Sequence, residues 1–429
     1  MNNARKENQE ELRQVQEAAE AGGLRKLTKY SALMGPAWLA IALNIGGATV
    51  TASVVLGSKS GFKFLWAIIP EVFAIWIICI VFVRLTLATN DGPISAVRRH
   101  LGAEAAWVTA VSVFVVNTVF HAVQYMLIGI TMKTIFGVDQ RVGALTGLVF
   151  VLAIVFNPAK GKAYIKTIET TLRILVWALL LSFLVILFLV EIDWAAFLQG
   201  FIPGLPVDAD EAITFVGVLG AAIAINVPVL AAYGAKQRQW SQAYRHLSLF
   251  ELTYTNIILV LVQFIIITAV ASTLFKTGQV VTAPVTAAKA LEPFAGGASV
   301  YLFSFGLLGA VFTTIVSQVL ISGFVITDTL KWDVNAASLR FKFAELMVTL
   351  FGVTAPLFGW NAFKAVVYGS AFNLSFAPVI VVLWLVMVKR QTVMGDLRAS
   401  TTMNIALILA VLIALSATLN FWMSLPAGR

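Results

Sequence analysis

The feature that most constrains this chain is a series of apolar stretches, each long enough to cross a lipid bilayer. A hydrocarbon core about 30 Å thick needs about 20 residues of α-helix, and stretches of this length recur from Tyr30 onward. We therefore expect an all-α membrane protein with about eleven crossings. The predicted spans are residues 33–57, 63–89, 105–135, 143–157, 167–190, 212–245, 248–275, 298–330, 341–358, 363–388 and 400–424.

Composition excludes a soluble fold for most of the chain. Hydrophobic residues make up 59% of the 429 residues and charged residues 12%, which is more apolar surface than a soluble domain can bury. Residues 1–31 are polar and have no signal-peptide pattern, so we expect a soluble cytoplasmic tail that is partly helical at most. Residues 32–429 should form one transmembrane domain. Cys79, the single cysteine, excludes an intramolecular disulfide.

Positive charges at the ends of the spans predict the orientation, because cytoplasmic loops retain Lys and Arg. The loops alternate between cation-rich and cation-poor, which places the N-terminus in the cytoplasm and the C-terminus outside in a multi-pass protein of a cell or inner membrane. We attribute the net charge of +9 to this signal and to contact with anionic membrane lipid, not to nucleic acid. The cation-rich set comprises Arg5, Lys6, Arg13, Arg25, Lys26, Lys29, Arg98, Arg99, Lys160, Lys162, Lys166, Lys236, Arg238, Arg245, Lys331, Arg340, Lys342, Lys389, Arg390 and Arg398.

Two spans carry residues that should interrupt a helix. The first has the pair Gly46-Gly47 near its middle, where helix propensity is weakest. The sixth has Pro228, which lacks an N–H and clashes with the preceding turn. Interrupted spans at matching places in two halves are typical of inverted-repeat transporters, here with repeats 33–190 and 212–388 and an extra helix 400–424. Alternatively, these residues mark only kinks or close packing.

Several stretches along the membrane portion resemble the NRAMP (natural resistance-associated macrophage protein) divalent-metal transporters. They are Gly35–Leu39, Gly61–Trp66, Arg84-Leu85 with Ala88-Thr89, Phe197–Pro203 and Gly220-Ala221. The resemblance covers essentially the whole membrane portion. It implies the LeuT-type fold, with two inverted five-helix repeats, an eleventh helix, and helices 1 and 6 broken at the midplane.

The family's metal-binding motifs are absent, which indicates a divergent branch. Where NRAMP proteins carry Asp-Pro-Gly-Asn, this chain has Gly46-Gly47-Ala48-Thr49, so glycine replaces the metal-binding carboxylate. The sixth-helix Met-Pro-His motif corresponds to Ala224-Ile225-Asn226. The resemblance further matches His121 and Gln124 to the acidic residues of the family's proton route, Asn373 to its tenth-helix glutamine, and Ala221 to its backbone carbonyl ligand.

These replacements remove the ligands that a divalent cation needs. A dication that loses water requires anionic or several strong oxygen donors, and a transition metal is further selected by sulfur or imidazole. Hydroxyls, amides and half-helix N-termini remain, which suit a small oxyanion. We expect bicarbonate, although formate, acetate or an amino acid fits equally. The predicted substrate-binding residues are Asn44, Gly46, Gly47, Ala48, Thr49, Ser53, Ala221, Ala224, Asn226 and Asn373.

Coupling requires a titratable group inside the membrane. His121 lies near the middle of the third span, and its ordinary pKa of about 6.5 allows it to carry a proton. Gln124 and Glu71 complete the predicted coupling set. The alternatives are a neutral hydrogen-bonded His121 and a structural carboxylate at Glu71. The sequence leaves Na⁺ coupling open.

Other functional classes compete with anion transport. A divalent-metal transporter for Mg²⁺ or Mn²⁺ with a more hydrated site is the main alternative, followed by neutral-solute transport and a non-transporting sensor. Enzyme motifs, phosphate loops and cofactor fingerprints do not occur, so we expect neither catalysis nor a cofactor.

Charged residues near the helix ends are assigned structural roles. Glu169 and Arg173, one helical turn apart, should form an intrahelical ion pair. Asp328 and Glu345 should be solvated or interfacial.

Overall fold

The computed structural model describes residues 2–425 with several gaps. The gaps are residues 157–166, 168, 172, 175, 176, 178–180, 182, 183, 186, 189, 279, 283–285, 288–291, 293–295 and 337. The fifth predicted span, 167–190, therefore lies largely outside the described residues, as do Lys160, Lys162 and Lys166.

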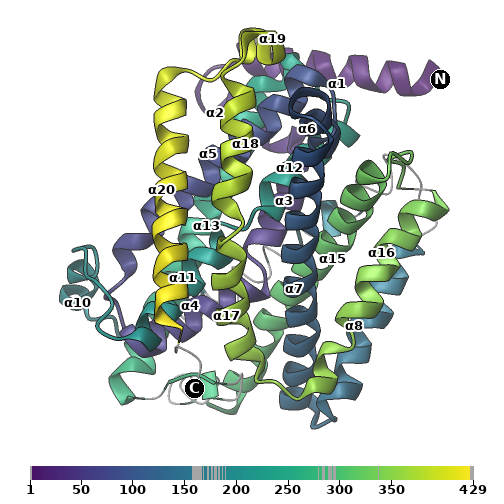
Figure 1. Ribbon diagram of the computed structural model, residues 1–429. Helices are drawn as coiled ribbons and strands as arrows, with labels where there is room; N and C mark the ends of the chain where they lie inside the picture. Colours follow the sequence, from purple (N-terminus) through teal and green to yellow (C-terminus); the bar gives the residue numbers. More distant parts are fainter. Residues whose placement is uncertain are drawn as a thin grey trace.

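The described chain is almost entirely α-helical. Its longer helices pack as a bundle, with both breaks deep inside it (Figure 1). The helices are α1 (Asn2–Glu20), α2 (Gly23–Leu33), α3 (Pro36–Asn44), α4 (Gly47–Ser60), α5 (Leu65–Thr89), α6 (Pro93–Leu101), α7 (Ala103–Phe136), α8 (Gln140–Val155), α10 (Trp194–Gln199), α11 (Ala209–Ala222), α12 (Asn226–Gln237), α13 (Arg245–Thr273), α15 (Ser299–Thr329), α16 (Leu339–Gly352), α17 (Ala362–Leu374), α18 (Ala377–Val388), α19 (Gln391–Met394) and α20 (Thr401–Ser424).

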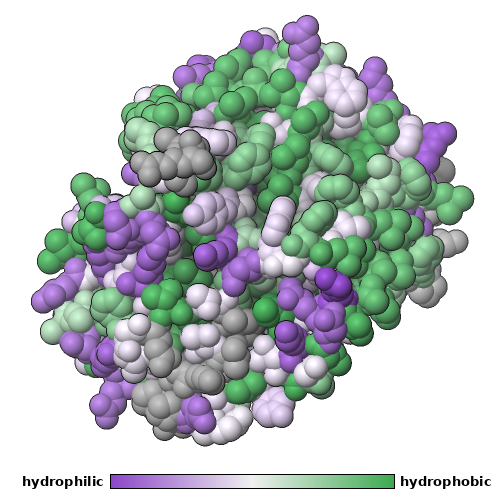
Figure 2. Space-filling view, turned by 60° about the horizontal axis from the view of Figure 1, so that its bottom comes forward, coloured by the Kyte–Doolittle hydropathy of each residue, from purple (hydrophilic) through white to green (hydrophobic). Residues whose placement is uncertain are grey.

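Nine helical stretches of the described chain are long and apolar enough to cross a membrane. The shorter apolar helix α8 adds a tenth candidate. Ten of the eleven expected spans are therefore present, and the fifth lies largely outside the described residues. Figure 2 shows hydrophilic residues gathered at the end of the bundle nearest the viewer and hydrophobic residues on the flank behind it. This distribution fits a multi-pass membrane protein.

Both predicted helix breaks are present. The first span divides into α3 and α4 at Ile45-Gly46, and the sixth divides into α11 and α12 at residues 223–225. A further break, which the sequence pattern did not predict, separates α17 from α18 at Ser375-Phe376.

The prediction of a tail that is partly helical at most is wrong. Residues 2–20 and 23–33 form α1 and α2. Arg13 forms ion pairs with Glu10 and Glu17 on the same helix face, an arrangement that stabilises exposed helices. Val15 and Ala18 are buried, so α1 packs against the rest of the protein.

Three predictions for charged residues are also wrong. Glu169 forms its ion pair with Arg238, which follows α12, and not with Arg173. The Arg173 guanidinium instead donates to the Met34 carbonyl and lies over the Trp38 ring. Asp328 and Glu345 are buried instead of solvated. Asp328 accepts hydrogen bonds from Tyr233 and Ser95, because α12 and α6 pack against α15 at this point.

Candidate functional site

The first break is centred on Gly46, where the backbone is extended (φ −76°, ψ −174°) between the last residue of α3 and the first residue of α4. A Cβ at Gly46 would lie 1.4 Å from the Thr314 hydroxyl oxygen of α15. The same oxygen accepts a hydrogen bond of 3.1 Å from the Gly47 N–H. Only glycine fits at position 46, because the Thr314 hydroxyl occupies the space where a side chain would begin.

The second break ends α11 at Ala222 and begins α12 at Asn226. Pro228 lies in the first turn of α12, where its missing N–H would have no partner within the helix and its fixed φ favours helix initiation. The proline therefore explains why the chain restarts its helix here.

Thr49 connects the two breaks. Its hydroxyl donates to the carbonyl of Asn44 at the end of α3 and lies 3.4 Å from the carbonyl of Ala221 at the end of α11. The last carbonyls of a helix have no partner within the helix. One short side chain thus serves the ends of two half-helices.

Asn373 on α17 binds the second break from the other side. Its amide Nδ2 donates to the Gly220 carbonyl at 2.8 Å. The contact is possible because α11 and α17 approach closely: a Cβ at Gly220 would lie 1.9 Å from the Ser370 carbonyl oxygen.

Several polar atoms around the breaks have no hydrogen-bond partner among the described residues. They belong to fully or almost fully buried side chains, and such atoms indicate water or a ligand. Gln124 lies directly against the first break, because a Cβ at Gly47 would be 2.5 Å from its Oε1. The atoms are Asn44 Oδ1, Asn226 Oδ1, Asn373 Oδ1, both Gln124 side-chain polar atoms, Thr51 Oγ1 and Ser53 Oγ.

A chain of polar contacts leads from the second break to His121. Asn226 Nδ2 lies 3.4 Å from Asn117 Oδ1, and Asn117 Nδ2 donates to the Gln318 carbonyl at 2.9 Å. The Gln318 side chain lies 3.2 Å from His121 Nδ1. His121 is fully buried and reaches the second break only through Gln318 and Asn117. Its Nε2 has no hydrogen-bond partner within the described residues.

The remaining predicted residues lie in different places. Ala48 and Ala224 line the breaks with small buried side chains. Ser53 is buried about two turns farther along α4. Glu71 lies elsewhere, between α5 and α13, where its Oε1 accepts a hydrogen bond of 2.6 Å from Gln263.

The side chains at the breaks are electrically neutral. Within the part of the chain that the structure describes, no group of three or more His, Cys, Asp or Glu residues could hold a metal ion. The partial charges come from the helices: α4 and α12 begin at the breaks with positive ends, and α3 and α11 end there with negative ends.

Sequence reasoning missed Thr314, Asn117 and Gln318. The available signal was the polar run Thr313-Thr314 with Ser317-Gln318 inside the otherwise apolar α15. Its polar residues are buried, and Ser317 contacts the Leu39 carbonyl of α3.

The paired broken helices define this protein as a multi-pass transporter with the LeuT-type fold. The family model described as "Natural resistance-associated macrophage protein-like" (Nramp) matches residues 37–424. The chain belongs to the Nramp family.

Relatives and solved structures agree with this assignment. The chain is 25% identical over 305 residues to "Divalent metal cation transporter MntH" of Erwinia tasmaniensis, covering 68% of this chain and 73% of that protein. It is 26% identical over 312 residues to the MntH of Yersinia pestis, covering 70% and 75%.

Two solved structures share the fold. A manganese transporter from Eremococcus coleocola superposes with a TM-score of 0.72 at 16% identity, covering 94% of this chain and 88% of that one. MhsT in complex with L-phenylalanine has a TM-score of 0.60 at 14% identity, covering 91% and 98%.

Proposed function

We propose that this protein is a secondary active transporter that carries a small anion, with bicarbonate favoured, through the paired helix breaks. The observation that carries the proposal is Gly46. Gly46 stands where the resemblance places the family's metal-binding aspartate, so this position has no carboxylate. The Thr314 hydroxyl occupies the space where a side chain would begin.

Charge is the main argument against a dehydrated metal ion. Moving a dication into a low-dielectric site without an anionic ligand carries a large desolvation penalty. Thr49, Asn226 and Asn373 offer only neutral donors and acceptors, and Ala224 offers no side-chain ligand. This set cannot replace the hydration shell of Mn²⁺ at comparable strength.

The same site has features that suit an oxyanion. The N-terminal ends of α4 and α12 meet the breaks and carry partial positive charge, and the Gly47 N–H already donates to the Thr314 hydroxyl. The unpartnered Gln124 amide adds a donor beside Gly47. Bicarbonate is small and planar, so it can accept hydrogen bonds from several of these groups at once.

A divalent cation is the second candidate, and the comparisons taken alone favour it. The MntH relatives are called divalent metal cation transporters, and the Eremococcus protein is called a manganese transporter. The unpartnered amide oxygens of Asn44, Asn226 and Asn373 could contact the water shell of a hydrated ion. Mg²⁺ retains water more readily than the other candidates.

Proton coupling is assigned to His121. The contacts through Gln318 and Asn117 connect its ring to Asn226 at the second break. Entry of bicarbonate together with a proton would be electroneutral.

Ligand-dependent thermal stability separates the two candidates, because a ligand that binds only the folded state raises Tm in a saturable manner. Purified protein is heated with bicarbonate, formate, Mn²⁺ or Mg²⁺ at matched pH and ionic strength, with chloride as the reference anion. We expect bicarbonate to raise Tm in the wild type and less in Asn373→Ala. A rise with Mn²⁺ or Mg²⁺ and none with bicarbonate would establish the second candidate instead.

A further inference from the structure

A small cavity lies at the end of the bundle where α20 ends, separate from the helix breaks. Its volume is about 150 Å³, which is enough for several water molecules. The cavity is lined by α4, α11, α17 and the segment 280–282 and is open to the surface on one side. Its polar lining comprises Lys59, Asp210, Thr214, Thr282, Asn361, Lys364 and Tyr368.

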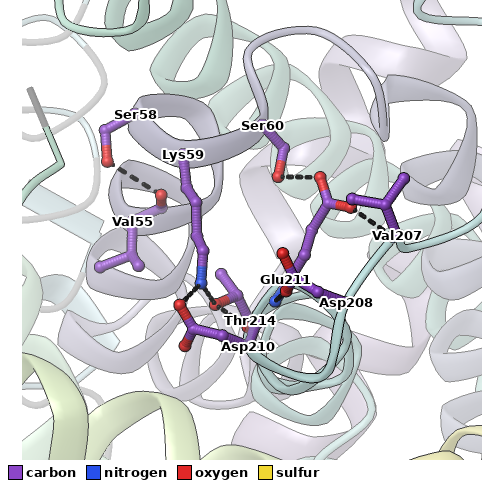
Figure 3. Close-up of polar contacts among 9 residues, drawn as sticks. All are labelled: Val55, Ser58, Lys59, Ser60, Val207, Asp208, Asp210, Glu211 and Thr214. Atoms are coloured by element: carbon purple, nitrogen blue, oxygen red, sulfur yellow. Dashed lines mark hydrogen bonds and ion pairs between the residues drawn. The ribbon is translucent and has the colours of Figure 1, made fainter. Parts of the chain in front are cut away.

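Lys59 supplies the first positive charge. It forms an ion pair with Asp210 and donates to the Thr214 hydroxyl at 3.3 Å (Figure 3). The Lys59 side chain is 17% exposed, whereas that of Asp210 is 80% exposed. An ion pair with so exposed a partner contributes little stability, so another anion can replace the Asp210 carboxylate at modest cost.

Lys364 supplies the second positive charge from α17, on the opposite wall. Its side chain is exposed, and it has no ion-pair partner among the described residues. The cavity lining therefore contains two lysines and one carboxylate, with hydroxyl and amide donors between them.

The segment 280–282 is attached to both walls. The Val281 N–H donates to the Ser58 hydroxyl of α4 at 3.1 Å, and Asn361 Nδ2 donates to the Thr282 carbonyl at 3.2 Å. These bonds hold the segment across the space between α4 and α17, so specific hydrogen bonds fix this side of the cavity.

The cavity lies in line with the helix breaks, because the same three helices form both. At 1.5 Å per residue, Lys59 is about 18 Å along α4 from Gly47, and Asp210 is about 18 Å along α11 from Ala222. Lys364 is about 14 Å along α17 from Asn373. The buried side chains of Val55, Ile213 and Val367 line its inner side.

We propose that this cavity is an entry site for a small anion, in which Lys59 and Lys364 bind the anion before it reaches the helix breaks. When no transported anion is bound, the Asp210 carboxylate pairs with the Lys59 ammonium in its place. The inference rests on the proposed anion transport, and it adds a second binding site on the face predicted to be external.

The first test measures the concentration dependence of bicarbonate uptake in sealed liposomes. Lys364→Gln should raise KM roughly three- to five-fold with little change in maximal rate, because one nearby unit charge concentrates anions by about that factor. Lys364→Glu should raise KM further. The effect should shrink at high salt, since a Debye length of about 8 Å at 0.15 M screens exposed charges.

Lys63→Gln is the matched control. Lys63 lies at the same end and pairs with Glu211, but it does not line the cavity. It should leave KM and its salt dependence unchanged, and Lys59→Arg should retain the wild-type KM. Equal KM values for wild type, Lys59→Gln and Lys364→Gln, with normal wild-type uptake, would overturn the entry site and leave the proposed function intact.

A second test does not depend on transport. Cys79 is the single cysteine and is buried, so a fluorophore can be placed selectively on Thr282→Cys at the cavity wall. The quantity measured is the ratio of quenching by iodide, an anion, to quenching by neutral acrylamide. This ratio should be higher in the protein that keeps both lysines than in the Lys59→Gln/Lys364→Gln background. An unchanged ratio would overturn the inference whatever the cargo. A fall in the ratio supports anion binding by the two lysines even if bicarbonate uptake proves absent.

Discussion

Gly46 shows how one residue can determine the chemistry of a transport site. Its missing side chain removes a candidate carboxylate and at the same time allows the Thr314 hydroxyl to reach the Gly47 N–H. The two residues are 268 positions apart in the sequence. Threonine within membrane helices commonly bonds the carbonyl four residues back, as Thr314 does to Ala310, so its second role could not be read from the sequence.

Gly46→Ala should impair both stability and transport. The added Cβ meets the Thr314 oxygen at 1.4 Å, and overpacking of this kind costs about 1–3 kcal/mol. We expect a lower Tm. If the added free energy destabilises the conformation that binds the substrate, uptake should fall roughly ten-fold, because about 1.4 kcal/mol corresponds to a factor of ten. The double variant Gly46→Ala/Thr314→Ala should recover part of both. Additive losses in the double variant would show that the two positions are not in contact.

His121→Gln should uncouple protons from cargo. Glutamine can keep a hydrogen bond to Gln318 but cannot titrate between about pH 5 and 8. We expect bicarbonate-dependent stabilisation to persist while the internal pH change that accompanies uptake disappears. Proton movement equal to that of the wild type would assign coupling to another group, of which Glu71 is the first to examine.

At the scale of helices, the sequence located both principal breaks because glycine pairs and proline act locally. The break between α17 and α18 was missed: Ser375 and Phe376 are ordinary helix residues, and Pro378 in the first turn of α18 was the only local signal. The Glu169–Arg238 pair was missed because its geometry depends on how distant helices pack. The positions of Gln318 and Asn117 between the break and His121 depend on packing in the same way.

Gly220→Ala should test the close approach of α11 and α17. The new Cβ would meet the Ser370 carbonyl oxygen at 1.9 Å, and a backbone atom cannot rotate away. We expect a lower Tm, a lower maximal uptake rate and loss of the Asn373 contact with the Gly220 carbonyl. Gly309→Ala on α15 is the control, because nothing lies within 4 Å of its added Cβ and alanine favours helix. Similar losses in both variants would exclude a specific role for the contact.

At the scale of the molecule, α1 and the C-terminal end of α20 lie at opposite ends of the bundle (Figure 1). This arrangement requires an odd number of crossings. Charge counts predict that the N-terminal end faces the cytoplasm, and an epitope tag at each end tests the prediction. In intact cells, an impermeant reagent should label the C-terminal tag and label the N-terminal tag only after permeabilisation. The reverse pattern would invert the topology and move the Lys59–Lys364 cavity to the inner face.

Flux measured with purified protein tests the central claim most directly. Wild type and Gly46→Ala are reconstituted into sealed liposomes that contain a pH dye, and uptake of labelled bicarbonate is compared with uptake of Mn²⁺ and Mg²⁺. The account predicts saturable bicarbonate entry with a change in internal pH, strongly reduced in Gly46→Ala, and no metal entry above that of empty liposomes. Saturable Mn²⁺ or Mg²⁺ entry without bicarbonate entry would contradict it and show that neutral oxygens suffice for a hydrated cation.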